Sequence, residues 1–136
     1  MTVQLSSPEG MISGVPFEHV AVATGSRQVH VAGQTSVDAD GSLVAPGDLT
    51  GQVSQAMRNV GRGLAAAGAG FGDVVRFTFY LPDWQTSKHD AFLAGIAAVA
   101  DELGIPQPMP PSTLIGVAAL FEPGNLIEIE ATAVVE

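Results

Sequence analysis

The sequence predicts a single α+β domain spanning residues 1–136, in which two helices cover one face of a mixed β-sheet. Its length of 136 residues suits one domain. Two segments place apolar residues at helical spacing, and the segments around them alternate or are rich in β-branched and aromatic residues, as strands are. Because the helices interrupt the series of strands, packing both on one sheet face is the economical arrangement.

The first predicted elements are two short strands, over residues 17–23 and 28–33. The cluster Thr24-Gly25-Ser26-Arg27 between them is typical of a turn. The pattern therefore predicts a β-hairpin formed by these two strands.

A helix is predicted over residues 49–68, where apolar residues recur with a period near 3.6. Asp48 or Thr50 can cap its beginning, and Gly68 stands where a C-terminal glycine is usual. Gly61 and Gly63 weaken the helix but allow a close approach to a neighbouring backbone.

A strand over residues 74–81 follows, and then a second helix from about residue 86 to 103 that Gly104 closes. Residues 105–111 contain four prolines, which exclude a helix or a central strand. Two last strands are predicted over residues 112–120 and 126–135, joined by the turn Glu122-Pro123-Gly124-Asn125.

Composition indicates an oligomer and excludes several partners. Hydrophobic residues make up 46% of the chain and charged ones 14%, so apolar surface is left to bury between subunits. The formal net charge is −9, and no Lys or Arg follows Lys88, which opposes binding to nucleic acid or to an anionic membrane surface. The negative net charge also disfavours binding of acidic small molecules, unless one arginine is held in a pocket.

The sequence contains no cysteine, so disulfides and thiolate chemistry are excluded. The first ten residues have no secretory pattern, and no apolar stretch approaches about 20 residues. A cytoplasmic location is therefore expected. The three histidines are too scattered to predict a metal site.

Three segments in order resemble the Rid family of reactive intermediate deaminases, also called YjgF. Val31-Ala-Gly-Gln34 resembles the family's "SGQ" strand end. Residues 52–81 resemble its central helix and following strand, and Pro111-Ser-Thr-Leu through Ile127-Glu-Ile-Glu-Ala-Thr-Ala-Val134 resembles its C-terminal signature. The resemblance covers nearly the whole chain.

This resemblance implies a chorismate-mutase-like fold, assembled as a homotrimer around a central β-barrel, with a pocket at each subunit interface. It also implies hydrolysis of a small-molecule metabolite, a reactive enamine or imine, to a keto acid and ammonia without a cofactor. RNA cleavage, an older association of the family, is opposed by the acidic composition.

Residue by residue, the resemblance places the water-directing glutamate at Glu128 and the residue after the signature serine at Thr113. The family's substrate-binding arginine falls on Pro111, which offers neither charge nor donor. The serine before Gly33 falls on Ala32, and an N-terminal tyrosine falls most nearly on Phe17. The candidate substrate-binding residues are Phe17, His30, Ala32, Gly33, Trp84, Pro111 and Ser112; the candidate catalytic residues are Glu128 and Thr113.

Each candidate also has a structural interpretation. Glu128 can be an acidic strand residue that caps an interface, and His30, which shares a strand face with Ala32, can be a hydrogen-bonded core residue. Phe17 and Trp84 can cover a subunit edge. Arg58 and Arg62, one helical turn apart, suit either an anion clamp or a solvated helix face.

Two functions follow. The first is a divergent imine or enamine hydrolase that does not take ordinary amino-acid-derived enamines. The second is a non-catalytic, metabolite-binding or chaperone-like trimer that keeps the cleft and has lost turnover.

Overall fold

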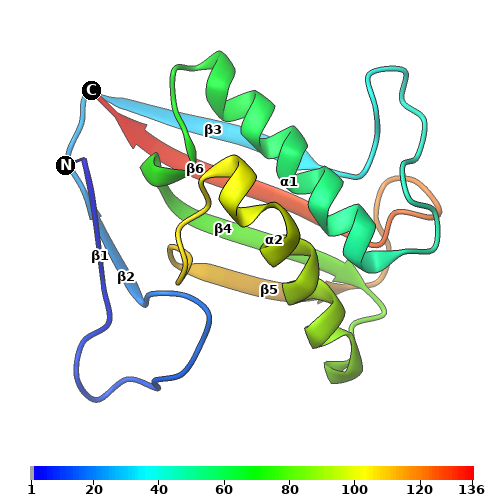
Figure 1. Cartoon of the computed structure of the whole chain (residues 1–136), viewed down its shortest axis with the longest axis horizontal. Coiled ribbons are helices and arrows are strands. Elements are labelled where there is room, and N and C mark those ends of the chain that lie inside the picture. Colours follow the sequence, from blue (N-terminus) through cyan, green and yellow to red (C-terminus); the bar gives the residue numbers. More distant parts are fainter. Residues whose placement is uncertain (1) are drawn as a thin grey trace.

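The computed structural model describes residues 2–136 and confirms an α+β fold with two helices on one face of a mixed sheet (Figure 1). The four-stranded sheet has the order β3-β6-β4-β5, in which only β4 and β5 run parallel. Its strands are β3 (Arg27–Gln34), β4 (Val74–Pro82), β5 (Ser112–Val117) and β6 (Glu128–Val135). The helices are α1 (Leu49–Ala66) and α2 (His89–Leu103), with short 3₁₀ turns at Phe71–Asp73 and Thr86–Lys88.

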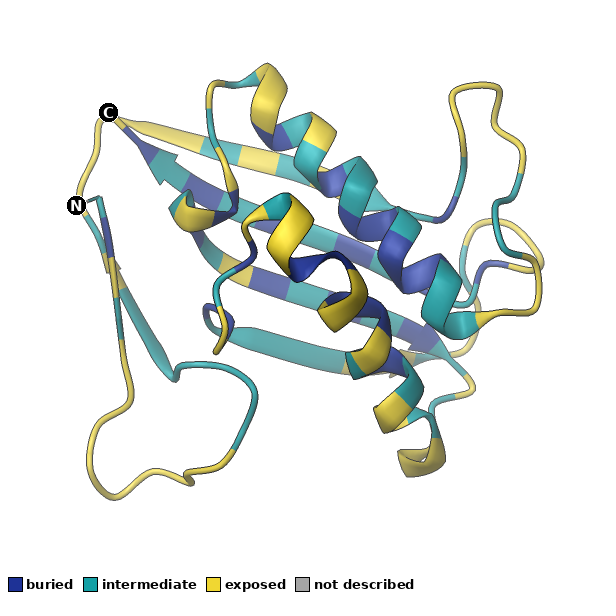
Figure 2. Cartoon of the chain, viewed as in Figure 1, coloured by how far each residue is buried: buried dark blue, intermediate teal, exposed yellow. Residues whose placement is uncertain are grey.

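The hydrophobic core lies between this sheet and the helices (Figure 2). Every second residue of β6, and of β4 from Phe77 onward, is buried there, including Phe77, Phe79, Ile129 and Ala131, while the residues between them are less buried and face away from the helices. This alternation separates a helix-covered face from an open face.

The helix ends follow the predicted capping chemistry. Asp48 is the N-cap of α1, and its carboxylate accepts a hydrogen bond from the Gly51 amide at 3.0 Å. The alternative cap was wrong: the Thr50 hydroxyl instead donates to the Ala91 carbonyl of α2 at 2.9 Å. Gly68 and Gly104 adopt φ of 75° and 72° just beyond the two helices, a backbone conformation that glycine allows.

The predicted hairpin between residues 17–23 and 28–33 was wrong. The first strand is shorter, β2 (Val20–Ala23), and it pairs with β1 (Val3–Ser6), a strand the sequence analysis missed. Figure 1 shows this two-stranded ribbon turned away from the main sheet. Gly25 permits the sharp departure, because a Cβ there would lie 2.5 Å from the carbonyl oxygen of Val135. Strand β3 pairs with β6 instead.

Buried polar side chains of α1 fix the loops at one end of the sheet. The Gln52 side chain is fully buried; its amide group donates to the carbonyls of Ala45 and Gly124, and its oxygen accepts from the Leu126 amide. These bonds hold the segment just before Glu128. Strand β5 accordingly ends at Val117 and β6 begins at Glu128, so both strands are shorter than predicted.

Within residues 2–136, neither helix is long and apolar enough to span a bilayer.

Candidate functional site

The open face of the sheet carries polar side chains in three rows that run across the strands. In the first row, His30 of β3 and Arg76 of β4 both face Thr132 of β6. In the second row, Thr78 of β4 lies between Glu130 of β6 and Thr113 of β5. In the third row, Tyr80 of β4 lies between Glu128 of β6 and Ile115 of β5.

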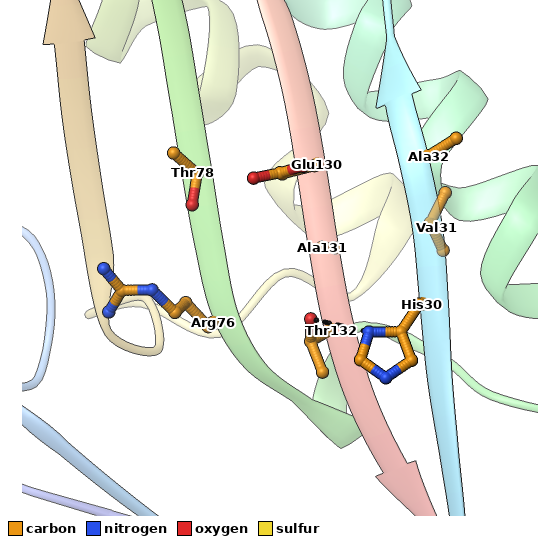
Figure 3. A pocket seen from close by; sticks show the side chains of 8 residues that line it. All are labelled: His30, Val31, Ala32, Arg76, Thr78, Glu130, Ala131 and Thr132. Atoms are coloured by element: carbon orange, nitrogen blue, oxygen red, sulfur yellow. Dashed lines mark hydrogen bonds between the residues drawn. The ribbon is translucent and has the colours of Figure 1, made fainter.

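A groove of about 530 Å3 lies over the first two rows (Figure 3). It is lined by His30, Val31, Ala32, Arg76, Thr78, Glu130, Ala131 and Thr132. Arg76 and Glu130 are the charged residues of this lining other than the histidine. The groove therefore offers one cation and one carboxylate to a ligand.

Arg76 is the cation of this groove. Its guanidinium Nη2 donates to Thr113 Oγ1 at 2.6 Å, which turns the side chain toward β5 (Figure 3). Arg76 is otherwise exposed. A guanidinium has five N–H donors, so most of its hydrogen-bonding capacity is free for a ligand.

Glu128 is packed against the α-carbon of Gly33. A Cβ at position 33 would lie 2.2 Å from Glu128 Oε2, so only glycine leaves room for the carboxylate in this position. The register of β3 and β6 shifts between Val31 and Gln34, which brings Gly33 under the side chain. Strand β3 thus positions the predicted water-directing group.

Tyr80 and Glu130 form a hydrogen-bonded pair beside the groove. Tyr80 Oη donates to Glu130 Oε1 at 2.6 Å. This hydrogen bond raises the pKa of Tyr80, and burial and the negative charges of Glu130 and Glu128 raise it further. The phenol therefore stays protonated at neutral pH and remains a donor to Glu130.

A second, apolar pocket of about 370 Å3 lies on the helix side of the β5 edge. Phe17 and Trp84 line it, together with the core residues Phe79 and Phe92, and Ser112 reaches its wall. The N-terminal segment is held there by backbone hydrogen bonds, from the Glu18 amide to the Met109 carbonyl and from the Met109 amide to the Pro16 carbonyl.

The predicted site residues therefore fall into separate groups in the single chain. His30 and Ala32 line the groove, Thr113 holds Arg76 at its edge, and Glu128 with Gly33 lies one row further along the sheet. The others lie elsewhere: Phe17, Trp84 and Ser112 line the apolar pocket, and the Pro111 carbonyl accepts a hydrogen bond from the Phe77 amide at 2.9 Å.

Two structural interpretations can be decided. His30 is exposed and is not a core residue of the chain; its ring is 3.1 Å from Gln28 Oε1. Arg58 forms an ion pair with Glu102 at 3.2 Å, and Arg62 donates a hydrogen bond to Asn59 at 2.6 Å, so the helix-surface interpretation fits both arginines.

Sequence reasoning missed Arg76, Tyr80 and Glu130 as site residues. A signal was present: Arg76, Thr78 and Tyr80 alternate with the apolar Phe77, Phe79 and Leu81, which places them together on the face opposite the core. What the alternation could not show is which residues of β5 and β6 lie beside them.

The comparisons with known proteins agree with this architecture. Residues 11–135 match the family described as Endoribonuclease L-PSP. A 2-iminobutanoate/2-iminopropanoate deaminase of Mus musculus is 31% identical over 108 residues, which cover 79% of this chain and 74% of that protein.

Solved structures give the same result. YyfB of Yersinia pestis, a protein of unknown function of the Rid family, is 36% identical with a TM-score of 0.88, over 99% of this chain and 100% of that one. TdcF of E. coli, solved with bound serine, is 25% identical with a TM-score of 0.69, over 97% and 94% of the two chains. On these grounds the chain belongs to the Endoribonuclease L-PSP family, which is the YjgF/Rid family.

Proposed function

We propose that the protein is a divergent imine or enamine hydrolase, with Glu128 as the group that directs water. The observation that carries this proposal is the fit of the Glu128 carboxylate against Gly33, on the open sheet face beside Tyr80. Relatives named 2-iminobutanoate/2-iminopropanoate deaminase support the reaction class.

In the proposed reaction, water attacks the carbon of a protonated imine while Glu128 accepts a proton from that water. The tetrahedral carbon then carries a hydroxyl and an amino group. Glu128 returns this proton to the nitrogen, and cleavage of the C–N bond with loss of the hydroxyl proton gives the carbonyl product and ammonia, which takes up the released proton to become ammonium. An enamine substrate first takes a proton on carbon and then follows the same course.

Substrate binding in this proposal differs from the arginine-dependent mode that the family resemblance implies for position 111. Pro111 has no N–H donor, and its carbonyl is already bonded to Phe77. Ala32 likewise has no hydroxyl to offer. These two positions support a substrate specificity that does not depend on a carboxylate held at the start of β5. The proposed assembly is a homotrimer, with pockets at the contacts between subunits.

The test is release of ammonia and carbonyl product from a panel of freshly generated imines and enamines. Glu128→Gln keeps the shape of the side chain and removes the base, so we expect hydrolysis to fall by about 10²–10⁴-fold. Glu122→Gln, on an exposed loop, serves as the control and should retain the wild-type rate. Equal rates for wild type and Glu128→Gln on every substrate would refute the catalytic role.

A non-catalytic, metabolite-binding or chaperone-like role is the second candidate, and the absence of side-chain donors at positions 32 and 111 favours it. Pro111→Arg separates the two. If the chemistry is intact and only the carboxylate contact has moved, this substitution should increase turnover of 2-imino acids. A protein without the chemistry remains inactive after the substitution.

A further inference from the structure

The apolar pocket on the helix side of the β5 edge has the size of a small-molecule site. Its volume of about 370 Å3 lies at the lower end of the range of about 300–1,000 Å3 in which proteins bind small molecules. Phe17, Phe79 and Phe92 line it together with Trp84, which is the only tryptophan in the sequence. Glu128 is not part of this lining and lies on the open face of the sheet. The pocket is therefore separate from the proposed reaction site.

The most buried part of the lining belongs to the hydrophobic core. Phe79 of β4 and Phe92 of α2 are 1% and 4% exposed, and their rings meet edge to face with centroids 4.9 Å apart and planes at 80°. Met109, from the segment before β5, is 2% exposed. Because these side chains are packed into the core on their other sides, this part of the pocket keeps its shape without a ligand.

Phe17 is held at the pocket by backbone hydrogen bonds on both sides of it. The Pro16 carbonyl accepts from the Met109 amide at 2.9 Å, and the Glu18 amide donates to the Met109 carbonyl at 2.7 Å. The Phe17 ring also meets the His19 ring edge to face, with centroids 5.4 Å apart. These contacts fix a partly buried aromatic ring in the lining.

Trp84 is fixed in the lining by the turn between β4 and α2. A Cβ on Gly116 would lie 3.0 Å from Trp84 Cβ, so the β5 backbone passes directly beside the tryptophan. The Lys88 ammonium group donates to the carbonyl of Asp83, the residue before Trp84, at 2.7 Å. An aromatic pocket assembled in this way needs little reordering when a ligand enters, which favours affinity.

The lining offers almost no charge to a ligand. In the part of the chain that the structure describes, no Lys, Arg, Asp or Glu lines the pocket, and its polar side chains are those of His89 and Ser112. The His89 side chain is 51% exposed and lies beside Asp90, and the Ser112 hydroxyl already donates to the Pro110 carbonyl at 2.8 Å. A charged ligand group would lose its water in this pocket without gaining an oppositely charged partner. The pocket therefore favours uncharged molecules.

We infer that this pocket binds an uncharged aromatic molecule of one or two rings, independently of the hydrolysis proposed for the open face. The lining supplies aromatic rings from four separate segments of the chain. A planar ligand gains edge-to-face and offset contacts with these rings, in addition to the burial of its apolar surface. One hydroxyl or carbonyl group on the ligand can form a hydrogen bond with His89 or Ser112.

The binding experiment uses two probes of similar size on the full-length protein in its native assembly: naphthalene-2-methanol and 2-naphthoate. Isothermal titration should show the alcohol binding at least about tenfold more tightly than the carboxylate, which brings a negative charge into a lining without Lys or Arg. The fluorescence of Trp84 should change over the same range of alcohol concentration. Equal affinities for the two probes, no detectable binding of the alcohol, or binding that leaves the fluorescence unchanged overturns the inference.

Substitutions at Trp84 assign the site. Trp84→Ala removes one aromatic side of the lining and should weaken binding of the alcohol about tenfold or more, while Trp84→Phe keeps a ring there and should retain most of the affinity. Phe121→Ala is the matched control, because it removes an aromatic side chain that is 91% exposed and outside the lining, and it should bind as the wild type does. Unchanged affinity in Trp84→Ala places any binding elsewhere and overturns the inference.

Folding and turnover are controlled separately. Thermal unfolding of each variant identifies any loss of structure. Leu93→Glu, which brings a carboxylate into the lining from α2, replaces Trp84→Ala if that variant does not fold, with the same expected loss of affinity. Glu128→Gln should bind the alcohol as the wild type does, whether or not it hydrolyses imines, since Glu128 lies outside the lining. Failure of the hydrolase proposal and failure of the aromatic site are thus distinguishable.

Discussion

At the residue scale, the position of one carboxylate depends on a missing side chain. The carboxylate of Glu128 packs so closely against Gly33 that a Cβ on residue 33 would lie 2.2 Å from Oε2. The glycine at the end of β3 is therefore explained by packing and not by backbone conformation, because Gly33 is not among the residues with positive φ. Its role is to leave space for a functional group.

Gly33→Ala should accordingly impair activity more than stability. The added methyl group displaces the flexible end of Glu128, so we expect a loss of about tenfold or more in kcat/KM with a change below about 1 kcal/mol in the free energy of unfolding. Gly72→Ala, whose new Cβ would meet nothing within 4 Å, is the control. A Gly33→Ala enzyme with full activity would show that Glu128 need not occupy this position.

Tyr80 offers a spectroscopic measure of the same site, since it is the only tyrosine in the sequence. The folded protein holds the phenolic proton more tightly than the unfolded chain, so its pKa lies above 10.0. The stabilisation is fully present below about pH 10 and is lost as the pH rises through the folded pKa.

Ultraviolet titration of tyrosinate in the native protein should therefore show a midpoint above 10.0. Glu130→Ala removes both this hydrogen bond and the charge of Glu130, so the midpoint should move down toward the ordinary value. A wild-type midpoint at or below 10.0 would contradict the Tyr80–Glu130 hydrogen bond.

At the element scale, the two helices approach each other through a glycine that the sequence analysis did not single out. A Cβ on Gly95 of α2 would lie 2.6 Å from the Thr50 carbonyl oxygen and 2.6 Å from Val53 Cβ of α1. The Ser54 hydroxyl donates to the Gly95 carbonyl at 2.7 Å, which ties the helices at the same point. By contrast, Gly61 and Gly63, which were expected to allow close packing, face the side chains of Phe71 and Val31.

Gly95→Ala should destabilise the protein, because the nearest atoms are a backbone oxygen, that of Thr50, and the Cβ of Val53, which is attached directly to the backbone, and neither can move aside freely. Overpacking costs about 1–3 kcal/mol and exceeds the gain of about 1 kcal/mol from replacing glycine in a helix. Gly61→Ala, with a ring atom of Phe71 at 3.1 Å as its nearest neighbour, should be close to neutral. Urea denaturation measures both, and an unchanged Gly95→Ala midpoint would mean that the helices can separate without cost.

At the scale of the whole molecule, a single chain exposes sheet edges and a sheet face that a partner subunit could cover. The sheet order places β3 and β5 at its edges, and the sheet face opposite the helices has no covering layer within residues 2–136. Ile115 on that face is 41% exposed, and Phe121 in the following loop is 91% exposed. These features support the proposed homotrimer, in which the open face turns toward other subunits.

Sedimentation equilibrium should therefore give three times the mass of one chain. Ile115→Glu places a charge on the open face and should shift the mass toward that of one chain. Arg62→Glu, on the outer side of α1, should leave the assembly intact. A wild-type protein that sediments as a single chain at micromolar concentration would refute the trimer.

The sequence by itself determined the α+β class, the two helices and their caps, and the division of β4 and β6 into a core side and an open side. These properties follow from local rules, namely the period of the apolar residues and the chemistry of Asp48, Gly68 and Gly104. The family resemblance singled out Glu128 and Thr113 as candidate site residues, and both lie on the open face.

Only the tertiary structure decided which strands pair and which side chains meet. The residues around Gly25 fit a hairpin turn, yet β2 pairs with β1, because β6 is the partner of β3. The contact of Arg76 with Thr113 joins residues 37 positions apart, and that of Tyr80 with Glu130 joins residues 50 apart. Register between distant strands sets both contacts, and no local pattern in a single sequence contains it.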